Sequence, residues 1–230
     1  MAEERARVEI LCAPLEEERE VDWLQSALDG EARAVLWHGV QGLVVPASYR
    51  RFPNLDAVRE RFVRDGWPVR VRRSGGRPVP QGPGILNLSL TRPLGGSAGV
   101  AFGAVYDDLC VTLAAALARL GVATRQAEVP GSFCDGRHNL AVGARKIAGT
   151  AQYWIRRGGR QAVLAHALLL VDVDTEVITA RLNELETTLG SGRRYLAGAV
   201  TTLARELPST GAEEIFDLVR RHLADVLAQR

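Results

Sequence analysis

The chain has 230 residues, of which 47% are hydrophobic and 24% charged, and its formal net charge is +2. These values lie near the globular average and exclude a disordered tail, a collagen-like fibre, a coiled coil and a nucleic-acid footprint. The sequence has no apolar run of 18 residues, so no membrane span is expected. It has no pattern of a signal peptide, and Cys12, Cys110 and Cys134 lack metal-ligand spacing. We therefore expect a cytoplasmic protein with reduced thiols and no metal site.

The first half of the chain alternates predicted helices with short predicted strands. Apolar residues at helical spacing predict a helix over 16–27, and Asn54 is a plausible N-cap for a helix over 55–64. Short apolar or alternating runs predict strands at 32–37, 42–45, 68–72 and 85–90, with a glycine-rich loop over 72–84.

The second half begins with the longest predicted apolar helix, over 105–120, which ends at Gly121. Strand patterns follow at 138–142, 146–155 and 162–171. The last fifth reads as helices over 176–189, 195–207 and 212–228, with Thr210 as the cap of the last one. This mixture predicts an α/β or α+β fold with one central sheet. The expected organisation is a single domain over 1–230 that ends in helices and has no separate accessory domain.

Lys146 is the single lysine in a chain with 28 arginines. A lysine among so many arginines suggests a role that arginine cannot fill, because arginine does not lose its proton. Gly143-Ala144 can form a hairpin turn that places Ala141 opposite Lys146. Strand alternation then puts mostly small residues on the lysine's face, which leaves volume for a ligand: Asn139, Ala141, Ala148, Thr150 and Gln152. The alternative is a solvent-facing lysine at the end of a hairpin.

Cys134 precedes Asp135-Gly136, a strong turn dipeptide. A thiol on a tight turn can be exposed enough to react, whereas most free cysteines are small buried hydrophobes. Seven residues separate Cys134 from Ala141, roughly 23 Å if fully extended. A Cys–Lys pair therefore requires the loop over 131–136 to fold back.

Three segments resemble motifs of the superfamily of lipoate and biotin protein ligases and octanoyltransferases. Residues 136–152 resemble its Gly-Arg-Asn-Asp-like strand followed by a Lys-x-(Ala/Ser)-Gly pattern. Residues 72–84 resemble its Arg-Arg-x-Thr-Gly-Gly-Gly-x-Val-x-His loop, but Arg77 replaces the third glycine and Gln81 the histidine. Residues 164–170 resemble its His-Gly-x-Leu-Leu strand. The motifs occur in family order and cover about residues 20–210.

The resemblance implies a class II biotin/lipoate ligase-like catalytic domain, with a central mixed sheet flanked by helices. It implies that Lys146 is the catalytic lysine, which contacts the acyl carbonyl and, in ligases, the phosphate of an acyl-adenylate. The implied substrate-binding residues form the glycine loop and the pocket lining: Arg73, Ser74, Gly75, Gly76, Arg77, Asn139, Gly149, Thr150, Ala151 and His166.

Two features favour a transferase within this superfamily. Cys134 in Gly-Ser-Phe-Cys-Asp-Gly is placed like the nucleophile of octanoyl/lipoyl amidotransferases, and the chain ends at Arg230 without the accessory domain common in bacterial ligases. The resemblance then implies transfer of an octanoyl or lipoyl group from a carrier-protein donor to a lysine of a lipoyl domain through a Cys134 thioester, without a cofactor.

Two alternatives remain. An ATP-dependent lipoate ligase would use ATP and Mg and form lipoyl-AMP, with its accessory part on a separate chain. A non-catalytic acyl-binding module is motivated by Arg77 and Gln81 in the loop. No nucleic-acid or membrane partner is expected under any of these hypotheses.

Overall fold

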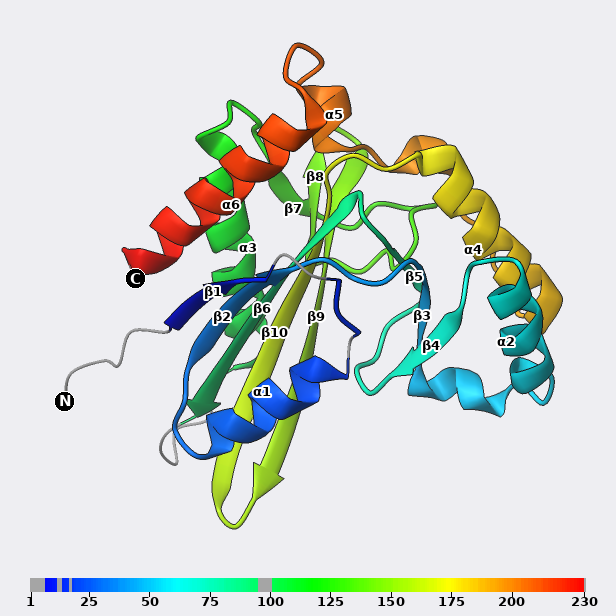
Figure 1. The fold of residues 1–230 in the computed structure, drawn as a ribbon, viewed down its shortest axis with the longest axis horizontal. Coiled ribbons are helices and arrows are strands. Elements are labelled where there is room, and N and C mark those ends of the chain that lie inside the picture. Colours follow the sequence, from blue (N-terminus) through cyan, green and yellow to red (C-terminus); the bar gives the residue numbers. More distant parts are fainter. Residues whose placement is uncertain (1–6, 12–13, 17, 95–100, 230) are drawn as a thin grey trace.

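The computed structural model describes residues 7–11, 14–16, 18–94 and 101–229, and within these ranges ten strands form two sheets (Figure 1). The larger sheet is mixed, as expected, because its first two strands pair in parallel and its other neighbours pair antiparallel. In spatial order, its strands are β1 (Arg7–Ile10), β2 (Arg33–Trp37), β6 (Ile85–Leu94), β10 (Arg160–Leu170), β9 (Arg145–Arg157), β8 (Asn139–Val142) and β7 (Arg125–Ala127).

The predicted central sheet is present, and three short strands form a second, smaller sheet that was not predicted. Strand β3 (Gly42–Pro46) pairs in parallel with β4 (Val69–Arg72) and antiparallel with β5 (Val79–Gln81). Helices α2 (Leu55–Arg64) and α4 (Thr175–Leu189) pack beside this small sheet (Figure 1). The apolar side chains of these elements bury one another in a separate core cluster, which explains why the strands do not join the large sheet.

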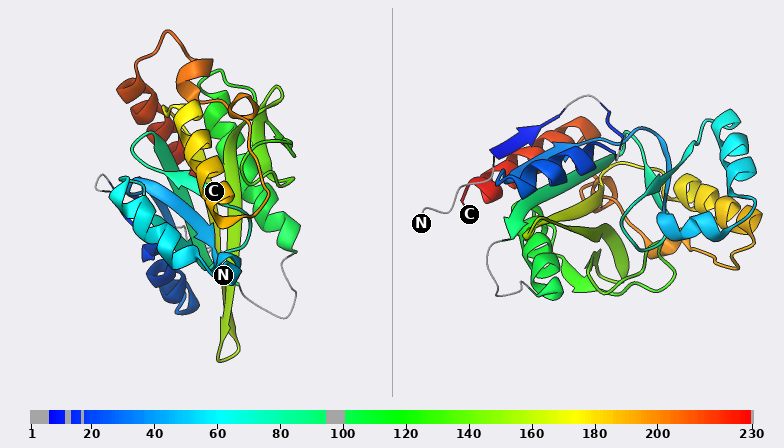
Figure 2. Two further views of the ribbon diagram at one scale, coloured as in Figure 1. Left: turned by 90° about the vertical axis from the view of Figure 1, so that its right-hand side faces the viewer. Right: turned by 90° about the horizontal axis from the view of Figure 1, so that it is seen from below.

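Helices α3 (Phe102–Ala118) and α6 (Ala212–Ala228) cover one face of the large sheet, and α1 (Arg19–Leu28) covers part of the other (Figures 1 and 2). The alternation of β10 explains this arrangement, because its odd-numbered residues pack with α3 and α6 while Ala162 and Leu164 pack with α1. His166 and Leu168 continue the second face and line a pocket shared with residues of the small sheet.

The predicted helix over 195–207 is wrong. Only a 3₁₀ turn, η2 (Ala197–Ala199), and a single turn, α5 (Leu203–Glu206), form there. The Leu196 amide donates to the Gly131 carbonyl at 2.8 Å, and the Thr201 amide donates to the Lys146 carbonyl at 2.8 Å. These bonds use backbone groups that a helix would pair internally, and they hold the segment against the loop before Cys134 and against β9.

The remaining predicted helices and longer strands lie where the sequence placed them, within a few residues, but one of the two predicted caps is wrong. Asn54 is the N-cap residue of α2, as predicted, although its side chain makes no cap bond and donates to the Thr188 carbonyl of α4 instead. Helix α6 has Gly211 and not Thr210 as its N-cap residue, without a side-chain cap bond. At α2, a hydrogen bond to α4 takes the place of the expected side-chain cap, and at α6 no side chain caps the helix start. Strands β1, β5 and β7 were not predicted.

No helix in the described ranges combines the length and apolar character that a membrane crossing requires. Helix α6 is instead tied to the core through His38. The Nδ1 of His38 lies 2.9 Å from the Ile85 carbonyl, and its Nε2 lies 2.7 Å from Nη2 of Arg220, while its ring packs edge-on against Phe216. Arg220 can only donate, so His38 is neutral here, with its proton on Nδ1.

We expect this contact to make stability depend on pH. Burial lowers the pKa of His38 below its usual 6.5; the hydrogen bond to the Ile85 carbonyl raises this pKa in part, and the charge of Arg220 lowers it further. On acidification the unfolded chain therefore binds this proton before the folded chain, and stability falls as the pH drops below about 6.5. Glu213 and Asp217 of α6 also line the adjacent cavity. Urea unfolding of the parent and His38→Gln between pH 5 and 8 measures the effect. Identical pH profiles for the two proteins would contradict this expectation.

Candidate active site

The loop before β8 folds back and brings Cys134 to Lys146. The Nζ of Lys146 donates to the Phe133 carbonyl at 2.6 Å and to the Cys134 carbonyl at 3.1 Å. The Asn139 side chain donates to the same Cys134 carbonyl at 3.0 Å. Three hydrogen bonds thus fix the turn that carries the thiol, and the fold-back that the sequence left open is present.

Cys134 has a left-handed backbone with φ of 49°, the only positive φ of a non-glycine residue in the described part of the chain. Such a conformation costs a residue with a Cβ roughly 1–2 kcal/mol. It persists only where the surroundings over-determine it, which is common at functional sites. Here the surroundings are the hydrogen bonds from Lys146 and Asn139, so the strain and the lysine belong to one arrangement.

A β-bulge determines which residues share the face of Lys146. Ala141 pairs with Lys146 as predicted, but the register then shifts, and Leu140 pairs with Ala148. Ala148 consequently lies in the core cluster beneath α3, whereas a Cβ on Gly149 would lie 2.8 Å from Nζ of Lys146. Strict alternation predicted the opposite assignment for these two residues. The extra residue re-aims the lysine into the pocket, a known use of bulges.

Lys146 is fully buried, with no exposed surface, which excludes the solvent-facing alternative. Burial lowers its pKa to about 8, although the negative charges of Cys134 and Asp135 raise the pKa in part. The ammonium group also lies 4.5 Å from the centre of the Phe133 ring. A lysine in this state can take up and release a proton near neutral pH, which an arginine could not do.

The glycine loop lies against the thiol. Nη2 of Arg72 donates to the Gly75 and Arg77 carbonyls, each at 2.9 Å, and holds the loop closed. At Gly76, whose φ is +99°, a Cβ would lie 3.0 Å from the sulfur of Cys134. A residue without a side chain is required there by both the backbone and the space.

Both unexpected residues of the loop have partners. Arg77 forms an ion pair with Asp135, at 3.1 Å, beside the cysteine. Gln81 is buried and exchanges two side-chain hydrogen bonds with Asn87, at 2.9 and 3.0 Å. These residues therefore hold the loop in place. Their contacts give no support to the alternative of a non-catalytic acyl-binding module.

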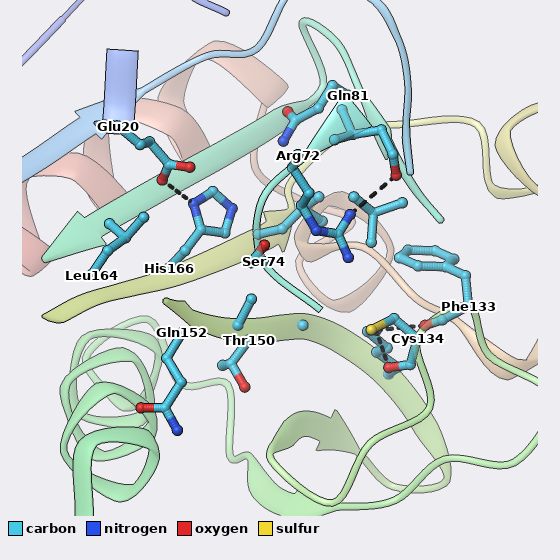
Figure 3. Close-up of a pocket in the computed structure, with 16 residues that line it drawn as sticks. Glu20, Arg72, Ser74, Gln81, Phe133, Cys134, Thr150, Gln152, Leu164 and His166 are labelled. Atoms are coloured by element: carbon cyan, nitrogen blue, oxygen red, sulfur yellow. Dashed lines mark hydrogen bonds and ion pairs between the residues drawn. The ribbon is translucent and has the colours of Figure 1, made fainter. Parts of the chain in front are cut away.

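One pocket joins these groups. Apolar side chains from both sheets and from the cysteine loop form much of its lining: Val44, Val79, Phe133, Leu164 and Leu168. Phe133 and Cys134 lie on one side of it, and Glu20 and His166 lie on the other (Figure 3). An apolar pocket beside a thiol and a buried lysine has the composition of a site that could hold an acyl chain with its carbonyl at the sulfur.

Glu20 and His166 form a polar wall. Oε1 of Glu20 lies 2.6 Å from Nδ1 of His166 and accepts a hydrogen bond from Ser89 at 2.6 Å. Trp37 donates to the Ser89 hydroxyl at 2.8 Å. An ionised carboxylate only accepts, so the proton of this His–Glu bond belongs to Nδ1.

The predicted site residues divide into three groups. Seven of them line the pocket: Cys134, Lys146, Ser74, Gly149, Thr150, Ala151 and His166. Gly75, Gly76 and Asn139 line an adjoining cavity that also reaches Cys134. Arg73 is exposed beside a third cavity, and Arg77 faces Asp135, so the structure does not bring these two arginines into the pocket.

The sequence analysis missed Arg72 and Glu20. Arg72 is the last residue of β4, and strand alternation directs it inward while Arg73 points outward, a signal that was available in the pattern. Glu20 lies 146 residues before His166 and belongs to none of the three motifs, so no local pattern predicted their contact.

The comparisons with known proteins agree with this geometry. The lipoyl protein ligase A/B catalytic domain family matches residues 48–224. An uncharacterised protein of Cupriavidus necator is 46% identical over 210 residues, which are 86% of this chain and 82% of that protein. An octanoyl-[GcvH]:protein N-octanoyltransferase of Kyrpidia tusciae is 45% identical over 148 residues, 60% of this chain and 50% of that enzyme. The chain therefore spans about half the length of that transferase.

Among solved structures, lipoate-protein ligase A bound with ATP has a TM-score of 0.72 with this chain. The similarity covers 98% of this chain and 86% of the ligase, at 17% sequence identity. At this identity the likeness establishes the fold alone, and the predicted class of catalytic domain is confirmed at that level.

Proposed function

Because the chain belongs to the lipoyl protein ligase A/B catalytic domain family, we propose that it transfers an octanoyl or lipoyl group between carrier lysines through a thioester on Cys134. The observation that carries this proposal is the strained Cys134 turn hydrogen-bonded to a buried lysine at an apolar pocket. The Kyrpidia tusciae relative is named for an octanoyl-[GcvH] donor, which supports a lipoyl-domain protein as donor and acceptor here.

In the first half-reaction, neutral Lys146 takes the thiol proton and the sulfur attacks the carbonyl of the octanoyl-lysine amide. The C–S bond forms, the C–N bond breaks, and Lys146 returns its proton to the departing amine. In the second half-reaction, the acceptor amine attacks the thioester, Lys146 accepts the amine proton, and the thiolate leaves and recovers that proton. One amide replaces another, so the reaction balances without ATP.

The lowered pKa of Lys146 suits both directions of this proton transfer. With a pKa of about 8, about one lysine in ten is neutral at pH 7, and about half are neutral at pH 8. A general acid–base group works best when its pKa lies near the working pH.

Intact-mass analysis tests the proposal. The purified protein is incubated with an octanoylated lipoyl-domain donor in the absence of ATP, and the expected result is one octanoyl adduct on Cys134 that an unmodified lipoyl domain then removes. Acyl-adenylate formation that needs ATP, with no adduct on the cysteine, would replace the proposal by the ligase alternative. Binding of octanoate with neither product would favour the acyl-binding module.

Gly149→Ala is expected to slow acyl transfer by about 100-fold, because displacement of a catalytic group by about 1 Å can cost that much. The new Cβ would lie 2.8 Å from Nζ and 3.0 Å from Cε of Lys146, so the lysine must move while the backbone need not. Steady-state transfer rates measure the loss. Gly211→Ala is the matched control, since a Cβ there meets no atom within 4 Å. Transfer by Gly149→Ala at the parental rate would contradict the assigned position of Lys146.

A further inference from the structure

A second cavity reaches Cys134 from the side of α3. Its walls come from the start of α3, from the glycine loop and from the segment after Cys134. The residues that belong to this cavity and not to the acyl pocket are Gly75, Gly76, Phe102, Gly103, Tyr106, Gly136, His138 and Asn139. The proposed function leaves it without an occupant.

Cys134 lies where the two cavities meet. Cys134, Thr150, Ala151 and Gln152 line both of them. The sulfur also lies against Gly76, which lines the second cavity and not the acyl pocket. An acyl chain in the first pocket would therefore present its thioester carbon at the junction, and the second cavity would leave that carbon open to a nucleophile.

The lining of the second cavity suits an uncharged, slender chain. In the part of the molecule that the structure describes, this lining includes no Asp, Glu, Lys or Arg side chain. Four of its residues are glycines, and Tyr106 stacks on His138 with ring centres 4.3 Å apart. Such walls fit the four-carbon stem of a lysine, which readily lies along apolar surface.

The rim of this cavity carries an exposed aromatic side chain. The Phe102 side chain is 63% exposed and stacks on Trp154 with ring centres 4.5 Å apart. The Gln152 side chain donates to the Phe102 carbonyl at 3.1 Å and accepts a bond from Trp154 at 2.9 Å. The exposed ring is thus held rigidly next to the opening, where a protein that inserts a lysine would touch it.

We infer that the second cavity is the access channel for the substrate lysine of the carrier protein, with Phe102 in contact with the carrier's surface. This inference rests on the proposed function and names the route of its second substrate. The acyl chain and the lysine stem then approach the sulfur from different cavities, and both the donor amide and the acceptor amine use the same channel.

Two glycines allow the channel to be blocked without disturbing the backbone. A Cβ on Gly103 or Gly136 meets no atom within 4 Å, and neither residue has a positive φ. Gly103→Trp and Gly136→Trp therefore add bulk in open space beside the channel. Gly211→Trp is the matched control, because Gly211 has the same open surroundings and lines neither cavity. The first half-reaction is driven by a small donor, S-octanoyl-N-acetylcysteamine, and the second by hydroxylamine or by an unmodified lipoyl domain.

Both blocked variants are expected to form the acyl-enzyme from the small thioester and to release it to hydroxylamine. Their transfer to the lipoyl domain should fall by about 100-fold, as for a misplaced reactant, while Gly211→Trp transfers like the parent. Phe102→Ala, a truncation of an exposed side chain, should raise KM for the carrier more than it lowers kcat. Parental transfer to the lipoyl domain by both blocked variants would overturn the channel and leave the proposed function standing. Failure of the parent to form any acyl-enzyme would overturn both.

Discussion

Cys134→Ala is expected to abolish the acyl-enzyme and to lower octanoyl transfer by about 10⁴-fold or more, because removal of a nucleophile removes the covalent route entirely. The substitution should leave the acyl pocket intact, because Lys146 holds the turn through hydrogen bonds to the backbone carbonyls of Phe133 and Cys134, which the substitution keeps. Octanoate should still bind. The loss is measured as transfer rate per enzyme under saturating donor, together with the intact mass.

Cys110→Ala is the matched control for this substitution. Cys110 belongs to α3 and is buried in the core cluster, and burial raises the pKa of its thiol, so it is a poor nucleophile. The control protein should still carry one octanoyl group. Transfer by Cys134→Ala at the parental rate, or an octanoyl adduct on Cys110 in the parent, would refute the assignment of Cys134 as the nucleophile.

Lys146→Met is expected to lower transfer by about 10²–10⁴-fold, the range typical of a general acid–base group. The variant also leaves the Phe133 and Cys134 carbonyls without their shared donor, so the thiol turn loses two of its hydrogen bonds. Lys146→Arg should be similarly impaired, because a guanidinium keeps its proton and the site has no exposed surface for a larger group.

The pH profile separates proton transfer from packing. Burial lowers the pKa of Lys146 to about 8, so parental transfer should rise with pH toward 8 and then level off as the lysine becomes neutral. Lys146→Met should lose this rise while its residual activity persists. Arg145→Met, at the exposed neighbouring position, should keep the parental profile. A parental rise in the Lys146→Met profile would show that another group carries the proton.

The sequence predicted which residues meet at this site better than the shape of the site. Lys146 was chosen because it is the single lysine in a chain with 28 arginines, and Cys134 because it precedes a turn. Both residues line the pocket. The bulge between Leu140 and Ala141 was not predictable, because a one-residue shift in register leaves no signature in a run of small residues. The pocket face therefore contains Gly149 where alternation indicated Ala148.

Long-range contacts explain the other differences. The segment over 195–207 has a helical pattern, yet its amides bond to the Gly131 and Lys146 carbonyls, which are distant in the chain. The small sheet likewise exists because α2 and α4 supply it with a core of its own. In both cases tertiary pairing overrides local preference, which a single sequence does not reveal.

At position 134, the left-handed backbone favours one residue for stability, whereas the proposed acyl transfer requires another. By conformation alone, glycine is the residue best suited to position 134, because it adopts a positive φ without a Cβ penalty. A library of variants at this position, sorted first for heat resistance and then for acyl transfer, should therefore enrich glycine in the first sort and cysteine in the second. The thiol is retained at a thermodynamic disadvantage, which is the pattern of a stability–activity trade-off confined to one residue.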